Sequence, residues 1–397
     1  MPREWRNWSG SIRCTPRDVL TPADESEVVE LVRRARDSGT TLRPVGSGHS
    51  SSPLVRTDGW LVSVDRLAGV LAHDAERRRA TVGAGTRLED LGEGLFDAGL
   101  AMENLGDVDY QTIAGATATG THGTGPRFGN LSTQIAEVRL VTGTGEVLDI
   151  SAQQHPELLP AARLSLGALG IVTRLTLDVQ PHFEVVRRTW CAPVEWTLEH
   201  REELQQRHRN LDFYWYPRSN LTQVRALDDR RDPPEPSWTG PIRELESGPL
   251  HHKLPQDRDL RFEEIEYMLP SEAFEECFAE VRRRVLDRHR VAVAWRLLVR
   301  TIAADDIYLS NANDRATTTI ACLHNVGLPH DEYFADMESI FRDFGGRPHW
   351  GKKHSLTAKE LRGLYPDWDT FADIRRRLDP DGVLLTPDLA RLLEEDR

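Results

Sequence analysis

The stretch from Asn104 to Gly125 constrains this chain more than any other part of the sequence. It reads NLGDVDYQTIAGATATGTHGTG and holds glycines at positions 106, 115, 120, 123 and 125, with almost no bulky side chain after Ile113. Glycine permits tight turns and leaves room for a close neighbour. The backbone of this segment must therefore come very near another chain segment or a ligand.

A second glycine-rich loop lies about 60 residues earlier, at Arg43 to Ser52. Its sequence, RPVGSGHSSS, surrounds one histidine with two glycines and four serines. Backbone N–H groups and hydroxyls in such a turn can hold an anion, for example a pyrophosphate. The chain contains no GxxxxGK[ST] and no GxGxxG between a strand and a helix with an acidic residue about 20 positions on. Kinase, P-loop NTPase and nicotinamide Rossmann functions are therefore unsupported.

The hydrophobic pattern predicts an α+β fold. With 397 residues, the chain is long enough for two or three domains. Alternation and capping signals predict these elements: helices over residues 21–39, 88–98, 270–287, 330–344 and 367–378; strands over 60–64, 79–82, 137–141, 147–150, 291–302 and 317–323. The polar residues 228–255 read as a long surface loop. The second half is expected to pack helices on an antiparallel sheet.

Charge and composition exclude several classes of partner. The formal net charge is −13, which opposes binding to nucleic acid. No run of about 18 apolar residues predicts a membrane span, and the charged amino terminus does not resemble a signal peptide, so a cytoplasmic location is expected. The four cysteines are far apart and read as buried thiols.

Three segments hold the candidate catalytic side chains. His49 sits between Gly48 and Ser50, where a neutral imidazole can bond covalently to an electrophilic cofactor carbon. Arg300 lies within an apolar strand and must find an anion, a carbonyl or a cleft. His349 and Lys352 follow a Gly-Gly-Arg-Pro turn, where Lys352 can stabilise negative charge on a bound cofactor.

Other polar residues receive structural interpretations. His122 is expected to orient the backbone by hydrogen bonds. The pairs Asp305-Asp306 and Glu263-Glu264 lack a histidine at ligand spacing, so we interpret them as solvated or structural charge and predict no metal site.

Taken together, these segments resemble the sugar-1,4-lactone oxidases and alditol oxidases of the vanillyl-alcohol-oxidase flavoprotein family. The resemblance covers nearly the whole chain and is carried by the following motifs: WRNWSG at 5–10, VGSGHS at 45–50, TIAGATATGTHGTG at 112–125, GALGIVT at 167–173, RFEEIEYMLP at 261–270 and RPHWGK at 347–352. The segment at 261–270 looks more like the arabinono- and gulono-lactone oxidases than like the alditol oxidases.

The resemblance implies an FAD-binding, PCMH-type domain of two subdomains (1–181), a substrate or cap domain with an antiparallel sheet and flanking helices (182–346), and a carboxyl-terminal segment that closes the flavin site (347–397). It implies that His49 carries a covalent histidyl–FAD bond. It also implies a set of cofactor-binding residues: Arg43, Pro44, Val45, Gly46, Ser47, Gly48, His49, Ser50, Thr112, Thr117, Gly120, Thr124, Gly125, and Ile171 or Val172. Thr112, Arg300 and Lys352 would bind substrate, and Arg300, His349 and Lys352 would serve catalysis.

The sequence departs from the family pattern at the substrate site. Relatives usually have Glu-x-Arg before the arginine, whereas this chain has Leu298-Val299-Arg300. A histidine of the following strand also lacks a clear equivalent: Ala321 falls near its place and His324 lies three residues further on. A site that loses a hydrogen-bond partner for a substrate hydroxyl can lose several orders of magnitude in turnover.

We therefore expect an FAD-dependent oxidoreductase that acts on a carbohydrate-like alcohol, with L-gulono- or D-arabinono-1,4-lactone as the first candidates. Hydride would pass to flavin N5, and oxygen or another acceptor would reoxidise the flavin. The alternatives are an alditol oxidase on xylitol or sorbitol, an oxidase of a less polar or larger alcohol, and an inactive flavin-binding protein. The sequence does not define the oligomeric state.

Overall fold

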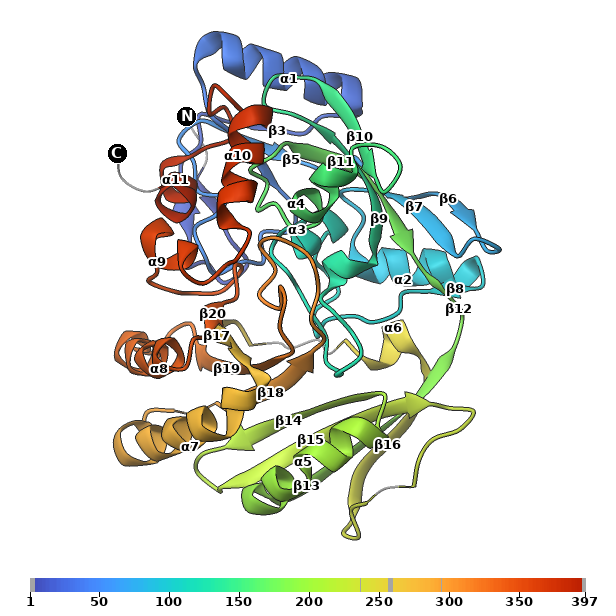
Figure 1. The fold of residues 1–397 in the computed structure, drawn as a ribbon, viewed down its shortest axis with the longest axis vertical. Coiled ribbons are helices and arrows are strands. Elements are labelled where there is room, and N and C mark those ends of the chain that lie inside the picture. Colours follow the sequence, from blue (N-terminus) through green and yellow to red (C-terminus); the bar gives the residue numbers. More distant parts are fainter. Residues whose placement is uncertain (1–3, 236, 256–259, 294, 395–397) are drawn as a thin grey trace.

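The computed structural model describes residues 4–235, 237–255, 260–293 and 295–394. The fold is α+β, as the sequence predicts. In Figure 1 the blue, cyan and green-cyan elements of the first half form the upper part, the red carboxyl-terminal helices pack beside them, and a large sheet fills the lower part.

Two sheets build the upper part. The first is parallel, in the order β3-β5-β4, and the second is antiparallel, in the order β10-β9-β11-β7-β6. Their strands are β3 (Asp18–Leu20), β4 (Leu42–Val45), β5 (Trp60–Ser63), β6 (Val70–Asp74), β7 (Arg79–Gly83), β9 (Ile135–Val141), β10 (Val147–Ser151) and β11 (Ile171–Asp178). Short pairs join β1 (Trp5–Arg6) with β2 (Arg13–Cys14), and β8 (Leu100–Ala101) with β12 (Gln180–Pro181).

The lower part is one antiparallel sheet of eight strands, in the order β16-β13-β15-β14-β18-β19-β17-β20. The strands are β13 (Glu184–Pro193), β14 (Asn210–Tyr216), β15 (Leu221–Asp229), β16 (Ile242–Pro249), β17 (Phe262–Pro270), β18 (Leu297–Ile302), β19 (Thr317–Asn325) and β20 (Arg347–Pro348). Because β20 belongs to the segment 347–397, that segment contributes directly to this sheet. The domain limits at 181 and 346 stay a proposal.

Helices cover these sheets through apolar faces and end at recognisable caps. The helices are α1 (Glu25–Ser38), α2 (Leu88–Asp97), α3 (Ile113–Ala118), α4 (Leu159–Arg163), α5 (Val194–Arg207), α6 (Leu250–Lys253), α7 (Phe274–Arg284), α8 (Asp331–Asp343), α9 (Ala358–Arg362), α10 (Trp368–Leu378) and α11 (Pro387–Leu393). In α1, the side chain of Asp24 accepts from the N–H of Glu27, and Gly39 ends the helix at φ 64°. Within the residues that the structure describes, no helix is long and apolar enough to cross a lipid bilayer.

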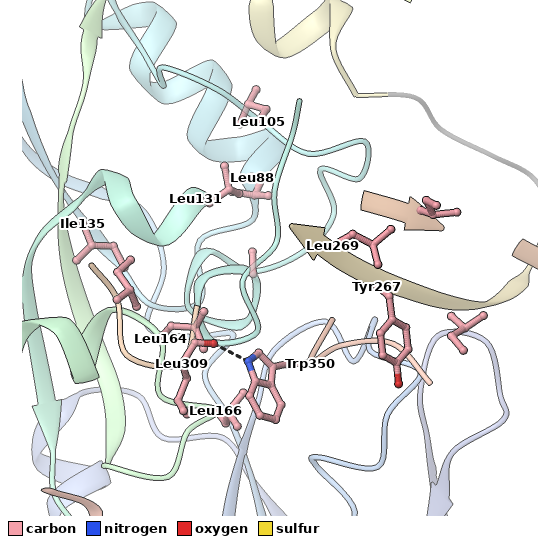
Figure 2. Packing of buried hydrophobic residues seen from close by; sticks show 14 of the residues in the cluster. Leu88, Leu105, Leu131, Ile135, Leu164, Leu166, Tyr267, Leu269, Leu309 and Trp350 are labelled. Atoms are coloured by element: carbon pink, nitrogen blue, oxygen red, sulfur yellow. Dashed lines mark hydrogen bonds between the residues drawn. The ribbon is translucent and has the colours of Figure 1, made fainter. Parts of the chain in front are cut away.

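A continuous apolar core links the two parts. Figure 2 shows Trp350 inside this core, near Leu164 and Leu166 of the upper part. Its indole N–H donates to the carbonyl oxygen of Leu309 at 2.7 Å, and its ring stacks on Tyr365 at 5.2 Å. Trp350 is fully buried and anchors the loop that carries His349 and Lys352.

Two sequence predictions about elements are wrong. Residues 242–249, predicted as part of a loop, form β16 at the edge of the large sheet; residue 236 of that predicted loop lies outside the described residues. The strand predicted from Val291 begins only at Leu297. Val291 is 90% exposed, and residue 294 lies outside the described residues. The other predicted helices and strands are confirmed to within a few residues.

Candidate active site

The loop that leaves β4 forms one wall of a cavity, which we call the loop cavity. All of residues 43–50 line it, together with Thr112 and Val172. Its described wall contains no Asp or Glu side chain. An anionic group such as a pyrophosphate therefore meets no repelling carboxylate there.

Two glycines let this loop lie tightly against its neighbours. A Cβ at Gly46 would stand 1.9 Å from Oγ1 of Thr112, and a Cβ at Gly48 would stand 2.9 Å from the ring of Trp5. Gly48 also has a φ of +64°, which disfavours other residues. The close-packed loop, the wall free of carboxylates and the apolar side chains opposite fit the pyrophosphate and flat rings of FAD.

Arg43 lines the loop cavity, and its guanidinium group stabilises the cavity wall through hydrogen bonds to backbone carbonyls. It donates to the carbonyl oxygens of Leu166 at 2.7 Å, Gly167 at 3.0 Å and Leu384 at 3.4 Å. Burial lowers the pKa of Arg43 to about 10, so the side chain stays charged at neutral pH. Arg43 thus connects its own loop to two distant segments, at 166–167 and at Leu384, behind the cavity.

A second cavity, which we call the sheet cavity, lies against the large sheet. The predicted catalytic residues Arg300, His349 and Lys352 all line it. His49 lines both cavities, as do Ser50, Gln111 and Thr119. The two cavities therefore meet at the histidine predicted to bond to the flavin.

The ring of His49 is held by aromatic neighbours at this junction. Its Nδ1 forms a 2.8 Å hydrogen bond with the hydroxyl of Tyr110. Its edge contacts the ring of Trp8, with 5.0 Å between centroids. The imidazole therefore has a defined orientation.

Strand alternation places the polar residues of the sheet cavity. Phe213 and Val299 are cross-strand partners, and Phe213 packs on Phe278 of α7. Since successive side chains point to opposite faces, Leu298 and Arg300 face away from α7 and into the sheet cavity, whose wall includes both.

Glu266 of β17 is the centre of the charge network in this cavity. One of its oxygens, Oε1, accepts from Arg300 Nη2 and Thr319 Oγ1, both at 3.0 Å. The same oxygen lies 3.2 Å from His122 Nε2. Burial opposes ionisation of Glu266, but the charge of Arg300 outweighs it and holds the pKa of this carboxyl well below its usual range.

His122 faces this network with a nitrogen that can accept a proton. Its Nδ1 lies 2.9 Å from the carbonyl oxygen of Gly123; because a carbonyl only accepts, Nδ1 carries the proton in the neutral ring. In the described part of the chain, neither His122 Nε2 nor Glu266 Oε2 has a hydrogen-bond partner. The two groups together form a buried, proton-accepting pair.

The loop from Arg347 to Lys353 joins the two cavities. The N–H of His349 donates to the carbonyl oxygen of Glu266 at 2.9 Å, and the N–H of Ser51 donates to that of Gly351 at 2.8 Å. Lys352 donates to Glu264 of β17. Burial lowers the pKa of His349 well below its ordinary value, so its ring is neutral near pH 7.

A metal ion is disfavoured by the charges at this place. His122, Glu266 and His349 offer ligand atoms within 4.8 Å of one another. However, Arg300 already supplies a positive charge to Glu266, and a second cation beside it would be repelled.

Several predicted cofactor residues lie outside the walls of both cavities: Thr117, Gly120, Thr124, Gly125 and Ile171. The hydroxyl of Thr117 donates to the carbonyl oxygen of Ile113, and that of Thr124 to Leu211. Ile171 belongs to the apolar core around α1. Thr112 lines only the loop cavity.

Of the two interpretations of Glu263 and Glu264, solvated or structural charge, burial contradicts the first. Both are buried; Glu263 pairs with Lys353 at 3.2 Å, whereas Glu264 lines the sheet cavity with Lys352. Sequence reasoning also missed Glu266. The available signal was a carboxylate between the apolar residues Ile265 and Tyr267, which resembles the signal that singled out Arg300.

Comparison with known proteins agrees with this geometry. Residues 16–151 match the family model described as FAD binding domain, and residues 243–392 match the one described as D-arabinono-1,4-lactone oxidase. The chain is 37% identical to L-gulono-1,4-lactone dehydrogenase of Mycobacterium tuberculosis, over 98% of this chain and 99% of that protein. It is 28% identical to mouse L-gulonolactone oxidase over 98% of each chain.

Solved structures share the fold. Cholesterol oxidase from B. sterolicum matches with a TM-score of 0.85 at 17% identity, over 99% of this chain and 97% of that one. At this identity the likeness extends to the fold alone.

Proposed function

This chain belongs to the family of FAD-dependent sugar-1,4-lactone oxidases and dehydrogenases, and from that premise we propose that it oxidises a CH–OH group of a sugar-1,4-lactone or a close analogue. The observation that carries the proposal is the meeting of the two cavities at His49. A flavin ring that extends from the loop cavity would lie beside a substrate in the sheet cavity.

We propose that His49 bonds covalently to FAD. The support is its place between the cavities and the fixed orientation of its ring. Bound FAD supplies the hydride acceptor for the reaction.

The residues of the sheet cavity bind the alcohol and move its proton. Arg300 and Lys352 place positive charge at the cavity wall, where they stabilise negative charge that develops during the reaction. Their paired carboxylates, Glu266 and Glu264, hold them in position. We assign the acceptance of the hydroxyl proton to the His122–Glu266 pair, because its two unpartnered acceptor atoms are buried beside the cavity.

The first experiment is an absorbance spectrum of the FAD-loaded protein during anaerobic addition of L-gulono-1,4-lactone, D-arabinono-1,4-lactone or xylitol. Bleaching by a lactone is the expected result. Retained colour with every compound would contradict the proposal. Reoxidation by oxygen or by an added dye then identifies the electron acceptor, since curated relatives are named both as oxidases and as dehydrogenases. The cytoplasmic location stays a prediction.

A further inference from the structure

The contact between α2 and α6 brings a carboxylate and two imidazoles together, away from both cavities. Glu93 lies on α2 in the upper part, and His251 and His252 lie on α6 beside the large sheet (Figure 1). Glu93 Oε1 is 2.7 Å from His252 Nε2 and 3.6 Å from His251 Nε2. Ligand atoms of all three residues lie within 4.8 Å of one another. We call these three residues the α2–α6 cluster.

The ring of His251 is held in place by α2. A Cβ at Gly92 would stand 2.8 Å from the Cβ of His251 and 2.9 Å from its Cγ. Glycine inside a helix costs stability, and here it makes room for the histidine. The ring also contacts Phe96, with 5.6 Å between centroids. His251 therefore enters the cluster in a fixed orientation.

The Nε2 atom of His251 is buried beside the carboxylate. Only 9% of the side-chain surface of His251 is exposed. Within the residues that the structure describes, its Nε2 has no hydrogen-bond partner. Buried polar atoms normally have a partner, because leaving one unsatisfied costs free energy. The nitrogen thus points to a ligand between His251 and Glu93.

The other two side chains can adjust around such a ligand. Glu93 is 59% exposed and His252 is 51% exposed. In a tetrahedral Zn²⁺ site with N and O ligands, neighbouring ligand atoms are about 3.4 Å apart. The separations of 2.7 Å and 3.6 Å from Glu93 Oε1 lie on either side of this value. Small rotations of Glu93 and His252 therefore complete the geometry.

The charge and chemistry of the cluster favour a transition-metal ion. Two neutral imidazoles and one carboxylate carry one net negative charge, and imidazole suits Zn²⁺, Cu²⁺ and Ni²⁺ better than Ca²⁺ or Mg²⁺. Among the described residues, Glu93 forms ion pairs with these two histidines alone. Glu266 differs, because Arg300 already supplies its positive charge.

We propose that Glu93, His251 and His252 bind one Zn²⁺ ion and that water completes its tetrahedral coordination. The ion connects α2 with α6, and so connects the upper part of the molecule with the large sheet. The inference does not depend on the proposed function. The sequence does not reveal the site, because 159 positions separate Glu93 from His252.

The test uses the FAD-loaded full chain without an affinity tag. The protein is stripped with a chelator and titrated with Zn²⁺ in a calorimeter. We expect one ion per chain. His252→Ala should weaken binding by at least about 10- to 100-fold, the loss that even an outer partner of a metal ligand causes. Excess Zn²⁺ should raise the Tm of the wild type by roughly 2–5 °C, and should leave that of the variant unchanged.

Two further variants sharpen the comparison. Glu93→Gln removes the carboxylate at an exposed position, so it tests the site even if His252→Ala folds poorly. It should also weaken binding. His155→Ala is the matched control: His155 lies 3.9 Å from the carboxylate of Glu157 but belongs to no such group of three among the described residues. It should bind Zn²⁺ as the wild type does. The flavin spectrum of each variant shows that the fold is retained.

Three outcomes would overturn the proposal. The first is a wild type that binds no stoichiometric Zn²⁺. The second is binding of wild-type affinity in both His252→Ala and Glu93→Gln, since the ion would then lie elsewhere. The third is loss of binding in His122→Gln with full binding in Glu93→Gln, which would place the ion at the buried group of His122, Glu266 and His349.

Discussion

His122 combines burial, proximity to Glu266 and an accepting ring nitrogen. These three properties fit a proton acceptor, a role beyond orientation of the glycine-rich backbone. Arg300 also donates to the carbonyl oxygen of His122 at 3.1 Å, so the backbone of His122 helps to position Arg300.

The variant His122→Gln should slow flavin reduction by about 10²- to 10⁴-fold, the usual contribution of a positioned base. FAD content should stay near the wild-type value, because His122 does not line the loop cavity. The measurement is stopped-flow reduction across a range of pH. His155→Gln is the control at an exposed position. A reduction rate equal to that of the wild type would remove His122 from the mechanism.

The variant His49→Ala should release its FAD into the supernatant when the protein is precipitated with acid, whereas the wild type retains yellow colour in the pellet. The reason is that His49 is the proposed point of covalent attachment. Tyr110→Phe serves as a comparison, since it removes the hydroxyl at Nδ1 and leaves the imidazole in place. Release of FAD from the wild type would show that the bond does not form.

At the scale of elements, the loop 347–353 connects the loop cavity with the sheet cavity. It pairs with β17 through His349 and Lys353 and with the loop after β4 through Ser51. Ser52 adds a 2.6 Å hydrogen bond from its hydroxyl to the carbonyl oxygen of Trp350. The predicted catalytic residues His349 and Lys352 therefore flank a buried indole ring that lines neither cavity.

The variant Trp350→Phe should lower the free energy of unfolding by about 1–3 kcal/mol, because the carbonyl oxygen of Leu309 loses its partner in the core. Flavin reduction should slow as well, since His349 and Lys352 lose their anchor. Urea denaturation and stopped-flow reduction measure the two effects. Trp196→Phe, on α5, is the control and should leave the reduction rate unaltered. An unchanged rate in Trp350→Phe would contradict the anchoring role.

Elements with a strong apolar pattern could be predicted, and charged elements could not. The edge strand β16 exposes most of its side chains and is held by backbone pairing with β13, so its sequence shows no strand pattern. The ion pairs of Glu264 and Glu266 could not be predicted either, because only the fold shows that Lys352 and Arg300 lie beside them. The loop around His49 could be predicted because its glycines are required locally.

At the scale of the whole molecule, the glycine-rich stretch 104–125 forms the joint between the two parts. The N–H of Gly125 donates to the carbonyl oxygen of Thr301 on β18 at 2.9 Å, and Asn210 of β14 donates to Asn104 at 3.0 Å. A Cβ at Gly125 would meet the ring of Phe128 at 2.6 Å. The close approach expected from the sequence is thus an approach to the large sheet.

Stability should decrease on acidification. Burial lowers the pKa of His349 in the fold, whereas an unfolded histidine has a pKa of about 6.5; below that pH the unfolded state binds a proton that the folded state does not. Glu266 acts in the same direction at lower pH. Burial opposes its ionisation, but the charge of Arg300 prevails and lowers its folded-state pKa, so its stabilisation is lost as pH falls below about 4.3.

The measurement is urea denaturation at pH 7 and pH 5. The wild type should lose free energy of unfolding between these values, and His349→Asn should lose less. His155→Asn, a change at an exposed histidine, should behave as the wild type. Equal pH dependence in all three proteins would show that His349 is not the group responsible.

The hydrogen bond between Arg43 and Leu384 can form only late in synthesis of the chain. Leu384 is 341 residues further along the chain than Arg43, which at roughly 5–20 residues per second means a delay on the order of 20 to 70 s. Until then the wall behind the loop cavity is incomplete, although the strands on either side of the loop have left the ribosome. The loop cavity is therefore complete only after Leu384 has been synthesised, and we expect tight binding of FAD to follow that step.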